Sequence, residues 1–264
     1  MGERKRILIT AMTYPRRSRK HREVVCTGGV LEDGRLIRLH PINVRDLSHV
    51  QRFRKYQWVE MEIEKNLSDP RSESYRPSFG KRIGIISKPI SGWRARMRWV
   101  LQDRSNLRTM CELSQGDGKV KSLGVVQPAK IEGIRQDYRG SDWPEEMRQL
   151  LLQQGLFGVE RKPLDWIPYQ FKVNYRCGWH ECNGHSQTII DGEVFELYRK
   201  VRRSAVDAEG AAERVREHLL NRVFAPDRQP YFYVGNMYRW WTSWLIVGIM
   251  WPKKAELAQV DITF

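Results

Sequence analysis

Two cysteines and two histidines lie within a nine-residue segment of the chain: Cys177, His180, Cys182 and His185. Thiolate and imidazole groups are the ligands that zinc prefers, and four of them complete a closed tetrahedral shell. The segment therefore predicts a metal site with zinc as its cofactor. Cys177, Cys182 and His185 form the core of this ligand set, because the spacing of His180 is tight for a shared ion.

Several groups are candidates for the fourth ligand: His180, the distant Cys26 or Cys111, or water. A water ligand would make the site catalytic, because zinc lowers the pKa of bound water to about 7. Two other interpretations are a surface loop with free thiols and an iron–sulfur cluster of all four cysteines, which leaves both histidines unexplained. Four cysteines in 264 residues do not form a disulfide framework.

Two carboxylates, Asp191 and Glu193, follow this cluster. Carboxylates near a histidine bind magnesium in enzymes that cleave phosphodiesters, so a metal-dependent nuclease is one hypothesis. The alternative is structural: Asp191 caps a helix, and Glu193 lies in its first turn, where the helix dipole stabilises negative charge. The residue spacings of common nuclease sites are absent, so we expect a structural role for the zinc.

Basic residues are concentrated in two segments of the chain. The whole chain has 46 Lys and Arg, 31 Asp and Glu and a formal net charge of +15. Residues 1–55 account for +9 of this and residues 81–110 for +7, whereas residues 111–264 are nearly neutral. Arginine predominates over lysine, 32 to 14, and its planar group suits phosphates and stacked bases. We predict nucleic acid, DNA or RNA, as the partner, against the alternatives of a solvated surface or a compositional bias.

The residues predicted to contact nucleic acid fall into three groups. The first is a basic loop with Arg16, Arg17, Arg19, Lys20 and Arg22. The second is a helix with Arg94, Arg96 and Arg98, which two tryptophans flank. The third is a hairpin loop with Arg239, Trp240 and Trp241, whose rings are suited to stacking on bases.

Other classes of protein lack support in the sequence. The Gly-rich sequences of nucleotide hydrolases and dinucleotide-binding domains are absent, as is the Gly-x-Ser-x-Gly turn of serine hydrolases. No window approaches 18 uninterrupted apolar residues, so we expect no membrane-spanning helix. No signal peptide is expected either, and a cytoplasmic location is the default.

Hydrophobic periodicity predicts an α+β fold. Residues 7–10, 24–30, 35–39, 58–64, 82–87, 123–126 and 131–134 are expected to form strands, with a loop over 68–77 and a helix over 92–103. Further strands are expected over 169–176, 231–234 and 244–250, with helices from about 192 and from a cap at Ser204–Asp207 to about 223. We predict a basic, mainly β, barrel-like domain over 1–141, a helical connector over 142–164, and a smaller α+β domain with a zinc-binding turn over 165–264. No internal repeat is evident.

Several short motifs in a fixed order resemble a known group of sequences. They are Thr13-Tyr14-Pro15, Arg38-Leu39-His40-Pro41, Cys177 to His185, and Val234-Gly235-Asn236. Together they resemble an uncharacterised bacterial protein family of similar length. The resemblance implies that residues 1–264 form one unit, and it carries over no catalytic residue.

The sequence as a whole favours a nucleic-acid-binding protein with a structural zinc site. We expect a reader or an accessory subunit in bacterial defence or repair. The first alternative is the nuclease with Asp191 and Glu193. The second is a protein–protein adaptor that binds a protein partner through the nearly neutral C-terminal half.

Overall fold

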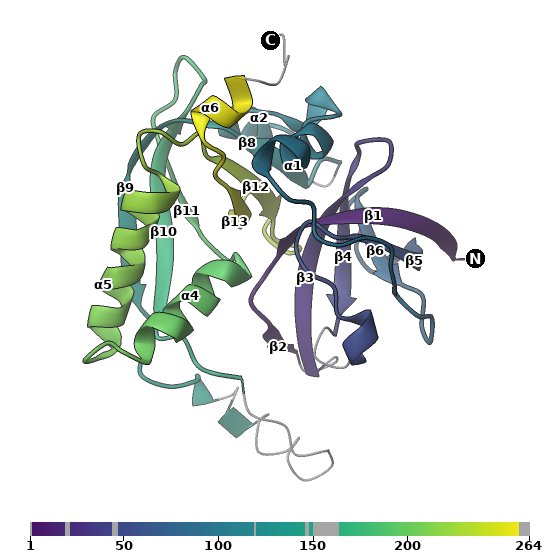
Figure 1. Ribbon diagram of the computed structural model, residues 1–264, viewed down its shortest axis with the longest axis horizontal. Helices are drawn as coiled ribbons and strands as arrows, with labels where there is room; N and C mark the ends of the chain where they lie inside the picture. The colour runs from purple at the N-terminus through teal and green to yellow at the C-terminus, as the bar shows by residue number, and fades with distance from the viewer. Residues whose placement is uncertain are drawn as a thin grey trace.

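The computed structural model describes residues 2–18, 22–43, 47–118, 120–145, 148–149 and 164–258, and for 16–18 and 22–24 it describes the backbone. The fold is α+β, as predicted, with a mainly β N-terminal part and most of its helices later in the chain (Figure 1). Within the described ranges, no helix is both long enough and apolar enough to cross a membrane.

The N-terminal part closes into a five-stranded barrel, as the prediction of a barrel-like domain requires. Its strands, in order around the barrel, are β1 (Glu3–Met12), β3 (Arg22–Leu31), β4 (Leu36–Ile42), β6 (Ser74–Pro77) and β5 (Trp58–Lys65), and β5 pairs again with β1. Only the β4–β6 pairing in this ring is parallel. Two short strands extend the sheet, β2 (Arg16–Ser18) beside β3 and β7 (Gly84–Ile85) beside β5. A ring in which the third and fifth strands pair in parallel has the topology of the OB fold.

Alternation of side chains builds the interior of this barrel. In β5, Val59, Met61 and Ile63 are buried, whereas Trp58 and Glu60 face outward. The expected loop over 68–77 is wrong for its last four residues, which form β6. This strand is held by pairing to β4 on one side and to β5 on the other, so its tertiary neighbours override its weak local signal.

The C-terminal part repeats the same strand order. Its first strand is interrupted at Gln127 into β8 (Leu123–Val126) and β9 (Pro128–Tyr138), and the others are β10 (Tyr169–Cys177), β11 (His185–Thr188), β12 (Tyr231–Asn236) and β13 (Trp244–Met250). β9 pairs with β10, β10 with β11, β13 with β12, and β12 with β8. A parallel bridge from Ile189 to Ile246 joins the two sheets, supported by a 2.8 Å hydrogen bond from Ile190 N to Ile246 O. The third and fifth strands are therefore parallel neighbours in this barrel too.

Helices complete both halves. α1 (Trp93–Val100) and α2 (Met110–Gln115) lie between the barrels in the sequence, and α6 (Lys254–Ala258) follows β13. α4 (Gly192–Arg202) and α5 (Ala208–His218) connect the third and fourth strands of the second barrel and pack on its core. Asp207 caps α5 by accepting a 2.7 Å hydrogen bond from Gly210 N. Short helical turns lie over His49–Gln51, Arg104–Asn106 and Leu219–Val223.

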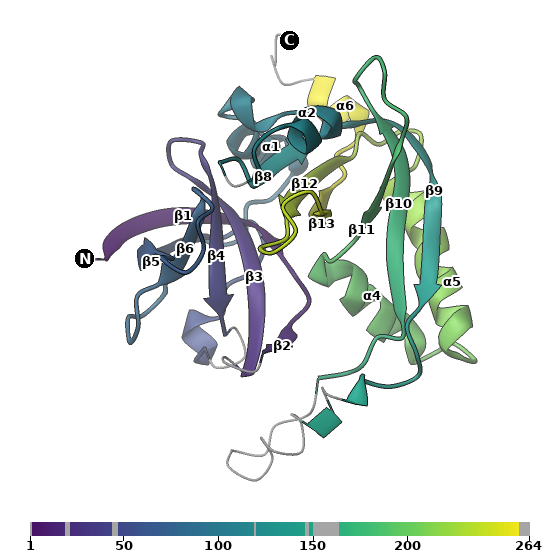
Figure 2. The same cartoon turned by 180° about the vertical axis from the view of Figure 1, so that it is seen from behind.

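The two barrels pack directly on each other, and β12 and β13 lie beside β3 in both views (Figures 1 and 2). Val30 and Leu36, on the outside of the first barrel, share a buried cluster with Leu123, Tyr233 and other residues of the second. A Cβ atom at Gly28 would lie 2.7 Å from the Tyr233 ring, so the absence of a side chain there permits the contact. The second barrel thus covers the outer face of β3 and β4.

The predicted division of the chain at residue 141 falls between β9 and β10. These two strands pair from Tyr138–Tyr169 to Pro128–Cys177. Of the predicted helical connector over 142–164, residues 146–147 and 150–163 lie outside the described ranges. The three-part division stays a prediction.

Candidate functional site

Four side chains from separate segments meet at one end of the second barrel. Cys111 lies on α2, Cys177 ends β10, Cys182 lies in the following turn, and His185 begins β11. Their ligand atoms all lie within 4.8 Å of one another. His185 Nε2 is 3.3 Å from the Sγ atom of Cys182, 3.4 Å from that of Cys177 and 3.5 Å from that of Cys111. Among the described residues, this is the one group of three or more His, Cys, Asp or Glu side chains with such spacing.

The geometry fits one tetrahedral metal ion. Bonds of about 2.3 Å to sulfur and about 2.0–2.1 Å to nitrogen place tetrahedral ligand atoms about 3.5–3.8 Å apart. The distance between the Sγ atoms of Cys177 and Cys111 is 3.5 Å, and the three distances to His185 are similar. The Cys111, Cys177, Cys182 and His185 set, which we call the Cys3His cluster, could therefore hold a metal ion.

The thiols of this cluster respond differently to their surroundings. Burial and the neighbouring sulfur atoms of Cys177 and Cys182 raise the pKa of the Cys111 thiol. Burial also opposes ionisation of Cys177, but the backbone N–H groups of Trp179 and Cys111 and contacts with His185 outweigh it and lower the pKa of Cys177. A metal ion at the centre would allow further thiols to ionise, so its binding releases protons.

Local sequence signals position these ligands. Thr109 and Glu112 form a capping box that starts α2 immediately before Cys111. In the turn between β10 and β11, Cys182 N donates to Trp179 O at 3.1 Å, and Gly184 has a φ of 97°, a conformation that favours glycine.

A second layer of side chains holds the histidine and α2. The Tyr175 ring lies 5.3 Å from the His185 ring. Its hydroxyl donates to Gln187 Oε1 at 2.5 Å, and Gln187 Nε2 contacts Met110 Sδ at 3.1 Å. Because Met110 precedes Cys111 on α2, this buried chain links the strand that carries the histidine to the helix that carries the distant cysteine.

His180 lies outside the cluster, although it belongs to the predicted ligand set. Its side chain is 74% exposed, and its Nε2 lies 3.5 Å from Glu181 Oε1. Cys111, one of the alternatives that the sequence left open, is the fourth member of the cluster, whereas Cys26 lies in β3 and is not part of the group. No helix is predicted from the sequence at α2, although the Thr109–Glu112 capping box indicates a helix start there.

Asp191 and Glu193, the candidates for nuclease chemistry, have partners within the protein. Asp191 is 1% exposed, and its carboxylate accepts hydrogen bonds from Glu193 N at 3.0 Å and Ile249 N at 2.8 Å. Lys55 Nζ, from the first barrel, lies 3.2 Å from Asp191 Oδ2 and 2.7 Å from Glu193 Oε2. Burial disfavours the ammonium group, but the two carboxylates outweigh it and raise the pKa of Lys55. Asp191 therefore caps α4, as the structural alternative predicts, and joins the two barrels.

The three predicted arginines of α1 are not equivalent. Arg94 and Arg98 are exposed, lie one helical turn apart, and have no ion-pair partner among the described residues. Arg96 is half-buried: its Nε donates to Ile90 O at 2.9 Å, and its guanidinium lies 4.2 Å from the centre of the Tyr56 ring. We therefore assign Arg96 to packing and leave Arg94 and Arg98 as candidate phosphate contacts.

The predicted basic loop connects the first two strands of the first barrel. Arg16 and Arg17 lie in β2, and Arg22 begins β3, with Arg16 paired to Val24. Arg19 and Lys20 lie outside the described residues. The described part of the segment is thus the strand pair of β2 with the start of β3.

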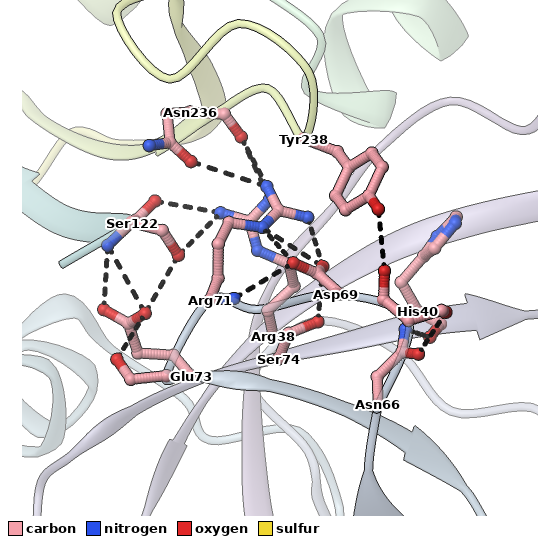
Figure 3. Close-up of polar contacts among 12 residues, drawn as sticks. Arg38, His40, Asn66, Asp69, Arg71, Glu73, Ser74, Ser122, Asn236 and Tyr238 are labelled. Carbon is pink, nitrogen blue, oxygen red and sulfur yellow. Dashed lines mark hydrogen bonds and ion pairs between the residues drawn. The ribbon is translucent and has the colours of Figure 1, made fainter. Parts of the chain in front are cut away.

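The loop of Arg239, Trp240 and Trp241 joins β12 to β13. Arg239 and Trp240 are exposed, whereas Trp241 is half-buried and packs edge-on at 6.0 Å from Tyr238. A buried polar network adjoins this loop (Figure 3). In it, Asn236 O accepts hydrogen bonds from Nη1 of Arg38 at 3.1 Å and Nη1 of Arg71 at 2.8 Å.

Residues 105–263, more than half of the chain, match the family described as "Domain of unknown function (DUF8757)". The chain belongs to this family. Residues 3–102 match a second family, "Domain of unknown function (DUF8758)", so the two matches meet between the barrels of this DUF8757 protein. Both families agree with the resemblance to an uncharacterised group.

The chain was also compared with curated proteins and with solved structures. No curated protein matches the chain. A solved structure described as "Structure of murine DNA binding protein bound with ds DNA" aligns with 95% of this chain and 94% of its own, at 6% identity and a TM-score of 0.33.

Proposed function

We propose that this DUF8757 protein binds nucleic acid through basic surfaces of its first barrel, and that the Cys3His cluster holds a structural zinc ion. Its task in this proposal is binding, as a reader or accessory subunit, rather than catalysis. The observation that supports the proposal is the place in the fold of β2 (Arg16–Ser18), the described part of the basic segment before β3.

That segment occupies a loop that OB barrels use for ligands. Oligonucleotides and oligosaccharides contact OB barrels at the loops between strands one and two and between strands four and five. The described part of this segment, β2, lies between β1 and β3, the first and second strands of the ring. The arginines of this segment favour a polyanion over a neutral saccharide, because guanidinium groups bind phosphate with two parallel hydrogen bonds.

The exposed side of α1 supports the same ligand class. The chain from Lys81 to Gln102 contains no acidic residue. Like charges one helical turn apart, as at Arg94 and Arg98, repel each other by about 0.2–0.5 kcal/mol. A bound phosphate would remove that repulsion.

The donor set of the cluster supports zinc in a structural role. Three thiolates and one imidazole suit zinc, and a site with four protein ligands has no open position for water or substrate. The site lies where α2 meets the β10–β11 hairpin, so the ion would fix a helix to the second barrel.

The test is purification from cells without added metal or nuclease treatment. We expect about one zinc ion per chain by elemental analysis, from the closed four-ligand set. We also expect an absorbance ratio at 260 and 280 nm that falls when the sample is washed at high salt, as nucleic acid is released. Protein that carries neither metal nor nucleic acid would overturn both parts of the proposal.

A further inference from the structure

The loop between β12 and β13 presents one tryptophan to solvent. Trp240 is 60% exposed, and no described aromatic ring packs against it. Its neighbours Tyr238 and Trp241 pack on each other instead. Exposing a large indole is costly when it could be buried, so its outward position suggests a ligand.

Hydrogen bonds hold the β12–β13 loop in place. Asn236 is buried, and its Nδ2 donates to Gly118 O at 2.7 Å and Trp241 O at 3.1 Å. Inside the loop, Ser243 N donates to Trp240 O at 2.9 Å. Tyr238 Oη donates at 2.8 Å to Ser68 O, in the loop between β5 and β6 of the first barrel. The indole is therefore presented by a preorganised loop, which reduces the entropy lost on binding.

Apolar and cationic residues lie in this loop and in two loops that are linked to it by hydrogen bonds. Leu67 and Val120 are exposed, and each belongs to a loop that is hydrogen-bonded to the same network through Ser68 or Ser72. Arg239 is exposed and has no ion-pair partner among the described residues. We call Leu67, Val120, Tyr238, Arg239 and Trp240 the three-loop patch.

The composition of this patch fits one ligand class. An aromatic face binds the face of a base, and an adjacent guanidinium binds its phosphate. In a duplex, neighbouring base pairs cover the base faces, whereas the bases of a single strand can be splayed out and stacked on protein rings. An uncharged peptide would use the apolar groups but leave Arg239 without a role.

We propose that Trp240 stacks on an unpaired base, so that the three-loop patch selects single-stranded nucleic acid. This inference rests on the proposed function and adds strandedness to it. The loop lies between the fourth and fifth strands of the second barrel, the position equivalent to a ligand-binding loop of OB barrels.

The experiment compares labelled single strands of about 15 nucleotides, DNA and RNA, with abasic strands of equal length and charge and with a duplex. In fluorescence anisotropy, we expect wild-type protein to bind the base-bearing single strand about 5- to 150-fold more tightly than the abasic strand, the range of one stacked base. Trp240→Ala should abolish this preference, and Trp240→Phe should retain most of it. Phe79→Ala, which removes an exposed ring elsewhere on the first barrel, is the matched control.

Equal affinity for base-bearing and abasic strands, a preference for duplex, or an unchanged preference in Trp240→Ala would each overturn the inference. Loss of a protein–protein contact in Trp240→Ala, with unchanged nucleic-acid binding, would overturn it in favour of a protein partner. The proposed function fails separately, if no probe binds in a salt-dependent way. Because Trp240 is exposed, we expect Trp240→Ala to keep the wild-type melting temperature, which confirms that the variant is folded.

Discussion

Substituting the candidate metal ligands one at a time distinguishes the Cys3His cluster from the four ligands that the sequence predicts within residues 177–185. The informative pair of variants is Cys111→Ser and His180→Ala. Cys111 lies within ligand distance of Cys177 and His185, whereas the exposed His180 does not belong to the cluster. We expect Cys111→Ser to lose the metal and His180→Ala to retain it. Cys26→Ser, outside the cluster, controls for the loss of a thiol.

The size of the effect follows from linkage between metal binding and folding. An ion that binds only the folded chain stabilises it by about 2.7 kcal/mol when its free concentration is a hundred times Kd. The matched unit spans residues 105–263, and in a domain of that size each kcal/mol moves Tm by about 2–4 °C. Loss of the ion should therefore lower Tm by about 5–11 °C.

The assay combines elemental analysis of each variant with thermal unfolding in the presence and absence of a chelator. The chelator should lower the Tm of wild type, Cys26→Ser and His180→Ala, and should leave Cys111→Ser unchanged. Metal loss in His180→Ala together with full metal content in Cys111→Ser would refute Cys111 as a ligand and would favour the predicted set with His180.

Three other perturbations test the contacts within and between the barrels. Asp191→Asn should destabilise the fold by about 3–5 kcal/mol in urea unfolding, because it leaves the Lys55 ammonium buried without its full counter-charge. A variant as stable as wild type would contradict a role for the Asp191–Lys55 ion pair in joining the barrels. Burial opposes ionisation of Asp69, but a neighbouring guanidinium outweighs it and holds the pKa of Asp69 below 3.8. The ion pair of Asp69 with Arg71 therefore stabilises the fold fully above pH 3.8, and this stabilisation is lost as the pH falls through the lower pKa of the folded state. The difference in unfolding free energy between wild type and Asp69→Asn should narrow on acidification. A difference that does not change with pH would contradict the ion pair. Gly28→Ala places a Cβ 2.7 Å from the Tyr233 ring and should lower the free energy of unfolding by about 1–3 kcal/mol. Calorimetry measures this, and an unchanged unfolding free energy would show that the barrels separate readily to accept the methyl group.

Local sequence patterns predicted three of the four members of the Cys3His cluster because one hairpin contains all three. Cys111 lies 66 positions before Cys177, and no local spacing connects the two. The Thr109–Glu112 capping box marks a helix start, but it carries no information about what that helix packs against. Long-range packing, here through Met110 and Gln187, decides the fourth ligand.

The barrels illustrate the same limit. Alternation in residues 58–64 and 169–176 predicted strands that are present, because side-chain period is a local property. The order of the strands is not local. Neither the closure of β5 on β1 nor the parallel bridge from Ile189 to Ile246 has a sequence signal of its own. The two barrels therefore share a topology although the sequence has no evident internal repeat.

Charge clustering predicted where basic residues gather but not the use of each one. Arg94, Arg96 and Arg98 have the same residue type on one short helix, yet Arg96 packs on Tyr56 and the other two face solvent. Likewise Trp240 is exposed and Trp241 is half-buried. Side-chain direction on a helix or a turn depends on the neighbouring elements, which the composition of a segment does not specify.

The central claim is that basic residues of the first barrel and the exposed arginines of α1 bind phosphates, and the salt dependence of affinity measures this most directly. For wild type, log K for a single-stranded probe should fall linearly with log salt concentration. Arg94→Glu/Arg98→Glu should weaken binding and reduce the slope by about 1.4, or about 0.7 per lost contact on a single strand. Arg202→Glu/Arg203→Glu, which makes the same change in net charge on exposed residues at the end of α4, should leave the slope unchanged. Equal slopes for wild type and both variants would contradict the claim.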